Sequence, residues 1–329
     1  MEKICLIDNL QEAFLRAARG KNGKQTTQMF RANLDRELLS ISTELSAGTY
    51  RFGGGYSFQI HDPKPRSIYA APFRDRVTFH AMMRICHPVF DAFQCYDSYA
   101  SRPGKGTYAA LFRAQALSGR HSWFAKVDVV HFFDSIDHGI LLRQLARLFK
   151  DARLLCYFRD LLDCYHSAPG KGIPIGNLTS QYFANHYLAV ADHYAKEQLR
   201  IPGLVRYMDD VIIFADSREM VIKLCQRYRD YLKDNLLLNT HPPVINRTSF
   251  GIPFLGYVVY PDRLRLNLRS KRRFRDKTED LMDNADNEDE YGKRLNALTA
   301  FVQKADVRGY VSKTYRSRGL VPQGRAPTG

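Results

Sequence analysis

Hydrophobic residues recur at helical spacing through the N-terminal part of the chain. The first fifty residues predict two amphipathic helices on either side of the polar segment 19–27, and residues 73–93 predict another helix. Between them, the glycines at 53–55 interrupt the pattern, and residues 56–61 alternate as a half-buried strand does. The prolines within residues 62–66 exclude a helix at that point.

The middle of the chain combines apolar strands with amphipathic helices. The apolar run 123–130 is typical of a central strand, and residues 204–208 and 211–214 predict two shorter strands. The other expected elements are helices at 138–149 and 152–166, a turn at 169–172, a helix capped by Thr179 or Ser180, a helix from Ser217 to about Asn235, and a strand from Leu236. This order predicts an α+β fold with helices on one face of a mostly antiparallel sheet.

The chain has 329 residues, enough for two or three compact units. Residues 263–275 hold seven basic side chains, whereas residues 276–290 are strongly acidic, so we place a domain boundary near Pro261. The expected divisions are residues 1–122, residues 123–260, a small helical unit at 261–315 and a disordered tail at 316–329.

The charge balance is basic, because 49 Lys and Arg residues stand against 34 Asp and Glu residues. The net charge of +15 favours a polyanionic partner, either nucleic acid or an anionic membrane surface. The longest apolar run, Val211–Ala215, is far too short to cross a membrane, and Glu2 and Asp8 would interrupt a signal peptide. The six cysteines form no Cys-x-x-Cys pair, so we expect buried, reduced thiols in a cytoplasmic protein.

The sharpest chemical feature is Tyr207-Met208-Asp209-Asp210 between two apolar strands. A hairpin there would project two carboxylates from the end of a sheet, although Asp-Asp is also ordinary turn chemistry. Asp128 lies in another apolar strand, where a carboxylate is costly unless something compensates it. Three carboxylates at neighbouring strand ends can hold two metal ions about 3.5–4 Å apart, an arrangement used in phosphoryl transfer.

Several blocks of sequence, taken in order, resemble those of reverse transcriptases. They are Lys-Pro-Arg at 64–66 with Phe-Arg-Asp-Arg-Val at 73–77, Ser-Arg-Pro-Gly-Lys-Gly at 101–106, Asp-Val-Val-His-Phe-Phe at 128–133, Gly-Ile-Pro-Ile-Gly-Asn-Leu-Thr-Ser-Gln at 172–181, Tyr-Met-Asp-Asp at 207–210 and Phe-Leu-Gly-Tyr at 254–257. The resemblance implies a right-hand polymerase with fingers in residues 1–122, a palm in 123–260 and a helical thumb in 261–315. It also implies DNA synthesis on an RNA template from deoxynucleoside triphosphates, with two Mg²⁺ ions for which Mn²⁺ can substitute.

The same resemblance implies roles for individual residues. Asp128, Asp209 and Asp210, with the backbone carbonyl of Val129, match the metal ligands. Lys64 and Arg66 match residues that grip the triphosphate, with a solvated basic turn as the alternative. Phe133 matches the bulky side chain that excludes a ribose 2′-hydroxyl, with a core position as the alternative.

Further roles follow for the C-terminal part of the chain. His241 lies near the position of a proton donor to pyrophosphate, a possible general acid. A basic run would contact the RNA/DNA duplex, unless it is only a solvated face: Arg269, Lys271, Arg272, Arg273 and Arg275.

The segment Ile175–Gln181 departs from the common family pattern Gln-Gly-x-x-x-Ser-Pro. Ile175 before Gly176, with Gln181 at the last position, resembles the reverse transcriptases of diversity-generating retroelements, which are bacterial or phage-encoded. Those enzymes copy a template-repeat RNA with errors concentrated at adenines. They work with a small basic accessory variability determinant protein.

Other functions stay open at this point. One is a retron-type or defence-associated reverse transcriptase whose pattern has drifted. Another is a catalytically silent RNA-binding scaffold, although such a scaffold need not keep three costly carboxylates together.

Overall fold

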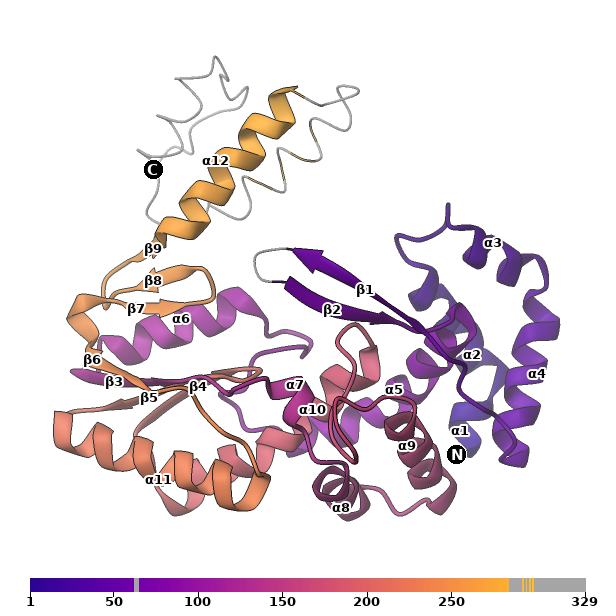
Figure 1. The fold of residues 1–329 in the computed structure, drawn as a ribbon, viewed down its shortest axis with the longest axis horizontal. Helices are drawn as coiled ribbons and strands as arrows, with labels where there is room; N and C mark the ends of the chain where they lie inside the picture. The colour runs from indigo at the N-terminus through magenta and orange to yellow at the C-terminus, as the bar shows by residue number, and fades with distance from the viewer. Residues whose placement is uncertain (62–64, 284–291, 293, 295, 297, 299–329) are drawn as a thin grey trace.

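The computed structural model describes residues 1–61 and 65–283, together with residues 292, 294, 296 and 298. Figure 1 shows N-terminal helices at one end, a layered sheet at the other, and a two-stranded hairpin between them. None of the helices in these residues is long and apolar enough to cross a membrane. All six cysteines are free thiols, but Cys156 and Cys164 are exposed rather than buried as expected.

The first fifty residues contain four helices rather than the two that the pattern predicts. They are α1 (Glu2–Cys5), α2 (Ile7–Ala18), α3 (Gln25–Ala32) and α4 (Leu34–Ala47). The additional breaks lie at Leu6 and Asn33, whose backbone angles are not helical. Helix α2 still buries one stripe of side chains spaced three and four residues apart: Leu10, Ala13, Phe14 and Ala17.

The expected strand at 56–61 is confirmed as β1 (Tyr56–His61). It pairs antiparallel with β2 (Pro65–Ala70), so that Arg66 lies opposite Ile60. Pro65 is the first residue of β2, a position where the missing N–H group costs no ladder hydrogen bond. The non-helical segment predicted at 62–66 therefore ends in the second strand of a hairpin.

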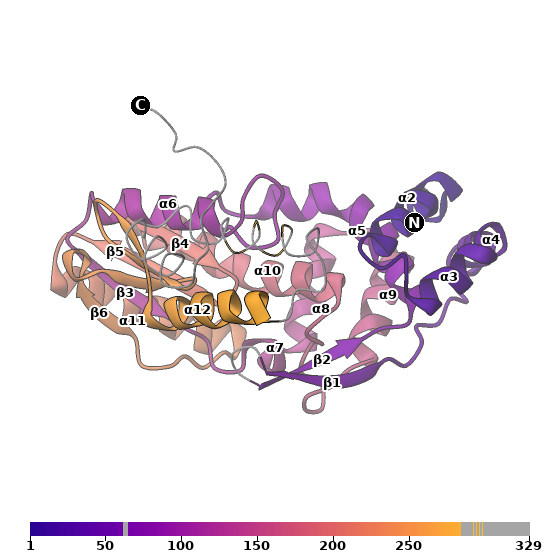
Figure 2. The same ribbon diagram turned by 90° about the horizontal axis from the view of Figure 1, so that it is seen from above.

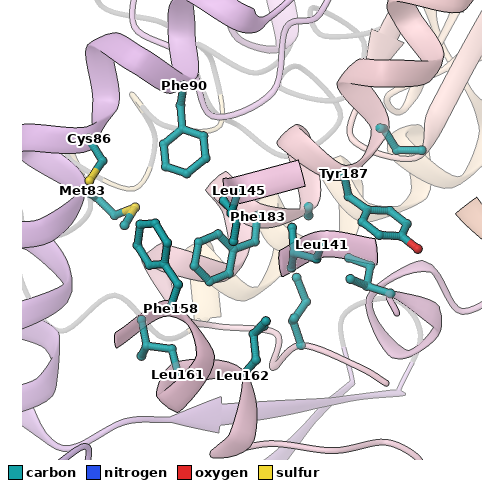
Figure 3. Close-up of a cluster of buried hydrophobic side chains, with 14 of the residues drawn as sticks. Met83, Cys86, Phe90, Leu141, Leu145, Phe158, Leu161, Leu162, Phe183 and Tyr187 are labelled. Carbon is teal, nitrogen blue, oxygen red and sulfur yellow. The ribbon is translucent and has the colours of Figure 1, made fainter. Parts of the chain in front are cut away.

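A helical layer joins the two ends of the molecule. It consists of α5 (Phe73–Phe93), α8 (His138–Leu148), α9 (Ala152–Asp163) and α10 (Leu178–His193), followed by the π-helical turn η1 (Tyr194–Gln198). Figure 3 shows their side chains meeting in one apolar cluster, with Phe90 from α5, Leu145 from α8, Phe158 from α9 and Phe183 from α10. Neither Thr179 nor Ser180 caps α10, because Asn177 is the residue that precedes the helix. The side chains of Thr179 and Ser180 are instead buried in its first turn.

A four-stranded antiparallel sheet forms the palm. Its strand order is β4-β5-β3-β6, with β3 (Trp123–Val127), β4 (Gly203–Tyr207), β5 (Asp210–Ala215) and β6 (Val244–Arg247). The antiparallel sheet backed by helices confirms the expected fold class.

Both faces of this sheet are covered, whereas the pattern predicted helices on one face. Helix α11 (Arg218–Leu236) packs against β3, β5 and β6 on one side. Helix α6 (Thr107–Ser118) packs against β4 and β5 on the other side (Figure 1). The reason is visible along β5, because Val211 and Ile213 belong to one buried cluster and Ile212 and Phe214 to the other.

The strand expected from Leu236 is absent from that position. Ser217 caps α11 as predicted, but the helix continues through Leu236, and Leu237 then adopts a left-handed conformation with φ of 53°. The chain returns to the palm at Thr240, which pairs with Val129, and β6 begins only at Val244.

The C-terminal described segment contains a second sheet and a helix. After the 3₁₀ turn η2 (Thr248–Phe250), strands β7 (Ile252–Phe254), β8 (Tyr257–Val259) and β9 (Leu264–Leu266) form an antiparallel sheet, followed by α12 (Leu268–Asp283). The boundary expected near Pro261 falls between β8 and β9, so strands from both sides of it share one sheet. Most of the expected thumb beyond Asp283, and the whole tail 316–329, lie outside the described residues.

Candidate active site

The strand register brings the three predicted carboxylates to one end of the palm sheet. Val127, the last residue of β3, lies opposite Val211 of β5. Asp128 follows Val127 and Asp210 precedes Val211, so both aspartates lie one step beyond this pair. Asp209 lies in the two-residue turn that joins β4 to β5, beside Asp210. A short helix, α7 (Phe132–Ser135), begins just after Asp128.

Burial and mutual repulsion disfavour the ionised forms of two of these groups. Burial raises the pKa of Asp209 to about 6, and the negative charge of Asp128 also raises it. Burial raises the pKa of Asp210 to about 7, with Asp128 and Asp209 adding to the effect. The strand register accounts for this repulsion, because it brings the three carboxyl groups to one end of the sheet. The cation of Arg66 on β2 opposes it at Asp209.

Lys126 is the nearest compensating charge. Its Nζ lies 3.1 Å from Oδ2 of Asp210 and donates to the carbonyl of Pro253 at 2.9 Å. The other oxygen of Asp210, Oδ1, is buried and accepts no hydrogen bond from any described residue.

The site offers the right donors for a divalent cation. Carboxylate and carbonyl oxygens are the ligands that Mg²⁺ and Mn²⁺ prefer, and the unsatisfied Oδ1 of Asp210 is one such donor. The pairing between Val129 and Thr240 uses the Asp128 carbonyl and the Val130 N–H, which leaves the Val129 carbonyl unused by that bridge. Within residues 1–61 and 65–283, no group of three His, Cys, Asp or Glu side chains already stands in ligand geometry.

The hairpin meets the palm through the segment that contains Ile175. The Tyr69 N–H of β2 donates to the carbonyl of Ile175 at 2.8 Å. Gly176 has φ of 120°, and a Cβ there would lie 2.8 Å from the carbonyl oxygen of Tyr69. This contact places β2, and Arg66 with it, close to the start of α10. Lys64 lies outside the described residues.

The other predicted site residues lie at varying depths. Phe133 is half-buried, with its ring 5.6 Å from that of the fully buried Phe132. Gln181 on α10 accepts from the Ser101 hydroxyl at 3.0 Å. His241 is exposed, and its backbone N–H donates to the Asp128 carbonyl at 2.9 Å, which ties it to the carboxylate cluster.

Helix α12 carries the residues that are predicted from the sequence to contact a duplex. Its buried face consists of Ser270, Phe274, Thr278 and Leu281. Arg269, Arg272, Arg273 and Arg275 are exposed and Lys271 is half-buried. Arg275 also approaches Asp276 at 3.3 Å and Glu279 at 3.8 Å.

Sequence reasoning missed two charged residues beside the carboxylates. Lys126 and Arg206 each stand in an apolar strand, where an unpaired cation is costly. That cost is the signal that could have found them, since it applies to a cation in such a strand as much as to Asp128.

Comparisons with known proteins agree with this geometry. A family model described as "Reverse transcriptase (RNA-dependent DNA polymerase)" matches residues 61–258. The chain is 25% identical over 174 residues to the putative COX1/OXI3 intron 1 protein of Saccharomyces cerevisiae, which covers 50% of this chain and 21% of that protein. It is 25% identical over 192 residues to protein YkfC of Escherichia coli, which covers 54% of this chain and 50% of YkfC. It is 25% identical over 144 residues to nuclear intron maturase 1, mitochondrial, of Arabidopsis thaliana, and the match covers 38% of this chain and 20% of that protein.

Solved structures show the same fold. Apo telomerase from Candida tropicalis aligns with a TM-score of 0.51 at 11% identity, covering 81% of this chain and 59% of that chain. Telomerase from Candida albicans aligns with a TM-score of 0.50 at 11% identity, covering 83% of this chain and 56% of that chain. The chain thus spans half or less of the curated relatives named above. Since the family match extends from the end of β1 into β8 and includes all three clustered carboxylates, the chain belongs to the reverse transcriptase family.

Proposed function

We propose that this protein is an RNA-directed DNA polymerase of the diversity-generating retroelement class. The observation that carries the polymerase activity is the convergence of Asp128, Asp209 and Asp210 at one strand end, where burial and repulsion raise the pKa of Asp209 and Asp210. Maintaining such a cluster costs stability unless a cation binds it. A silent scaffold would have no need to bear that cost.

The carboxylates would hold two Mg²⁺ ions with the help of the Val129 carbonyl. When bound, such ions activate the attacking 3′-hydroxyl and stabilise the leaving pyrophosphate. Lys126 pairs with Asp210 through its Nζ. His241, fixed to Asp128 through its backbone, is a candidate to donate a proton to pyrophosphate.

The hairpin and α7 would bind the deoxynucleoside triphosphate. Arg66, whose charge reaches Asp209, would pair with the triphosphate together with Lys64. Phe133, half-buried after Asp128, would block a ribose 2′-hydroxyl. The basic face of α12 would contact the backbone of the template–primer duplex through its arginines.

Ile175 and Gln181 support the finer assignment. A Gln side chain at position 175 could hydrogen-bond beside the nascent base pair, whereas Ile offers only apolar contact. The proposed product is DNA copied from a template-repeat RNA with errors directed at adenines, for targeted sequence diversification by mutagenic retrohoming. The accessory variability determinant protein is the proposed partner.

Primer extension on an RNA template tests the polymerase activity. Asp209→Asn and Asp210→Asn each remove charge while nearly preserving shape, so extension should fall about a hundredfold or more. Asp234→Asn, an exposed carboxylate on α11, is the matched control and should extend normally. Near-normal extension by the Asp209 or Asp210 variant would refute the assignment.

Single-nucleotide incorporation opposite each template base tests the class. The wild-type protein should misincorporate most often opposite adenine. Ile175→Gln should improve discrimination about two- to twelvefold, the worth of one hydrogen bond. Because the backbone carbonyl of Ile175 makes the contact to Tyr69, the substitution leaves that contact in place. Equal accuracy opposite all four bases would exclude the retroelement class and leave the polymerase proposal standing.

A further inference from the structure

Arg206 is completely buried directly before the Tyr207–Asp210 hairpin turn. Its guanidinium pairs with Asp192 of α10, with Nη2 at 2.7 Å from Oδ2. The exposed fractions of the two side chains are 0% and 1%. A buried ion pair of this kind adds little net stability compared with apolar residues of similar volume. Its position therefore calls for another explanation.

The remaining donors of Arg206 connect three elements. Nη1 donates to the Met208 carbonyl at 3.1 Å and to the Asn185 side chain at 3.1 Å. Nη2 donates to the Gln94 side chain at 3.2 Å, at the end of α5, and to the Asn185 carbonyl at 3.3 Å. The guanidinium thus joins the hairpin turn to α10 and α5, both of which belong to the helical layer.

Met208 is the turn residue that needs such a restraint. Its φ is 54°, in the left-handed region that favours glycine. It stands in the two-residue connection between Tyr207 and Asp210. A non-glycine residue persists there only when its surroundings over-determine the backbone. The backbone of Arg206 is itself held, because its N–H donates to Asp97 at 2.9 Å and its carbonyl accepts from Tyr99 at 3.0 Å.

We infer that Arg206 is a positioning residue that holds the strained Met208 turn and thereby sets the direction of the Asp209 and Asp210 carboxylates. This inference rests on the proposed polymerase function of the same site. Asp192 keeps the guanidinium in place, and the bond to the Met208 carbonyl transmits that position to the turn. Displacing a reacting group by about 1 Å can cost a hundredfold in rate, so a restraint on the turn has catalytic consequences.

Arg206→Lys keeps the positive charge but removes the set of guanidinium hydrogen bonds. Lysine keeps a cation beside Asp192, but its single ammonium cannot span Asp192, Asn185 and Met208 together. We expect kcat for primer extension to fall about ten- to a hundredfold, with KM for the deoxynucleotide and affinity for primer–template within about twofold. Arg206→Met combined with Asp192→Leu removes both charges at similar volume and should give the same loss of kcat if the lysine variant fails to fold.

Two further measurements exclude a merely structural role. Arg74→Lys is the control, because Arg74 also makes several guanidinium bonds, but to Glu37, Ser40 and Glu44 of α4 rather than to the hairpin turn. Per folded molecule it should retain kcat. Mn²⁺ binding to the free protein, followed by electron paramagnetic resonance, should be weakened severalfold by Arg206→Lys and unchanged by Arg74→Lys.

The outcomes distinguish the positioning role of Arg206 from the proposed function. Three results would overturn the positioning role of Arg206. They are wild-type kcat and Mn²⁺ affinity in Arg206→Lys, an equal loss of kcat in Arg74→Lys, and no Mn²⁺ binding by any of the proteins. If the wild-type protein does not extend primers, the polymerase proposal fails, and the Mn²⁺ titration alone then decides the role of Arg206.

Discussion

Asp210 shows at the scale of one residue how the site stores electrostatic strain. Its carboxyl pairs with Lys126 through one oxygen, whereas the other is buried without a partner among the described residues. Burial raises its pKa from 3.8 to about 7, although Lys126 opposes that effect. Ionised Asp210 is therefore costly at neutral pH when no cation is bound.

This strain predicts a pH dependence of folding in metal-free protein. Between about pH 4 and pH 7 the folded state holds a proton on Asp210 that the unfolded state has lost, so the free energy of unfolding falls as pH rises through this window. Asp210→Asn lacks this titration and should gain stability relative to wild type as pH rises, by up to a few kcal/mol. Urea unfolding in a chelator at pH 4 to 8 measures the difference.

Asp134→Asn is the control for this comparison, because its carboxylate is exposed. It should show no such trend against wild type. A stability difference between Asp210→Asn and wild type that stays constant from pH 4 to pH 8 would contradict the interpretation.

At the scale of elements, the β1–β2 hairpin depends on one close backbone approach. Gly176 lies against β2, where an added Cβ would meet the Tyr69 carbonyl oxygen at 2.8 Å and the Ile68 Cγ2 at 2.9 Å. The Tyr69 N–H donates to Ile175 beside it. Any side chain at 176 would therefore push the hairpin away from the start of α10.

Gly176→Ala should consequently destabilise the protein more than a glycine substitution that meets only backbone strain. Gly170 is the control, since its φ is 69° and a Cβ there would meet nothing within 4 Å. We expect the free energy of unfolding to fall about 1–3 kcal/mol further in Gly176→Ala than in Gly170→Ala, the usual cost of overpacking. Denaturant unfolding of both variants provides the measurement, and equal losses would show that the hairpin yields without cost.

At the scale of the whole molecule, charge and fold place basic groups on the same side of the palm as the hairpin. Helix α12 rises from the β7–β9 sheet on that side, whereas α11 covers the opposite face (Figure 1). Figure 2, seen from above, shows α12 running from the end that holds the palm strands toward the middle of the molecule. The proposed function therefore implies that a bound duplex contacts the basic face of α12.

Replacing Arg269, Arg272 and Arg273 with Gln should weaken duplex binding in a salt-dependent way. For each phosphate that the protein no longer neutralises, the slope of log affinity against log salt should become shallower by about 0.7–0.9, because fewer counterions are released. Lys223→Gln with Arg227→Gln, exposed on α11, is the control and should leave the slope unchanged. Fluorescence anisotropy with an RNA/DNA hybrid at several salt concentrations gives both slopes, and identical slopes would remove α12 from the interface.

Local pattern by itself determined much of this protein. The apolar runs around Trp123–Val127 and Val211–Phe214, the helix Phe73–Phe93 and the Ser217 cap all appear as expected, because side-chain period and capping act within a few residues. The order of motifs also identified the family. Periodicity placed the end of α11 within one residue, but it did not locate the breaks at Leu6 and Asn33, where tertiary contacts override weak local preferences.

The tertiary structure alone decided which distant residues meet. Strand register sets Asp128 beside Asp210 and gives Asp210 its Lys126 partner, and the packing of α6 against β4 and β5 covers the second face of the palm. The tertiary structure also buries Arg206 against Asp192 and Met208, although the strand pattern around Arg206 carried no sign of either partner. The physical reason is that pairing register and buried charge compensation depend on segments far apart in the sequence, such as Gln94 and Arg206, which are 112 residues apart and whose proximity no local pattern encodes.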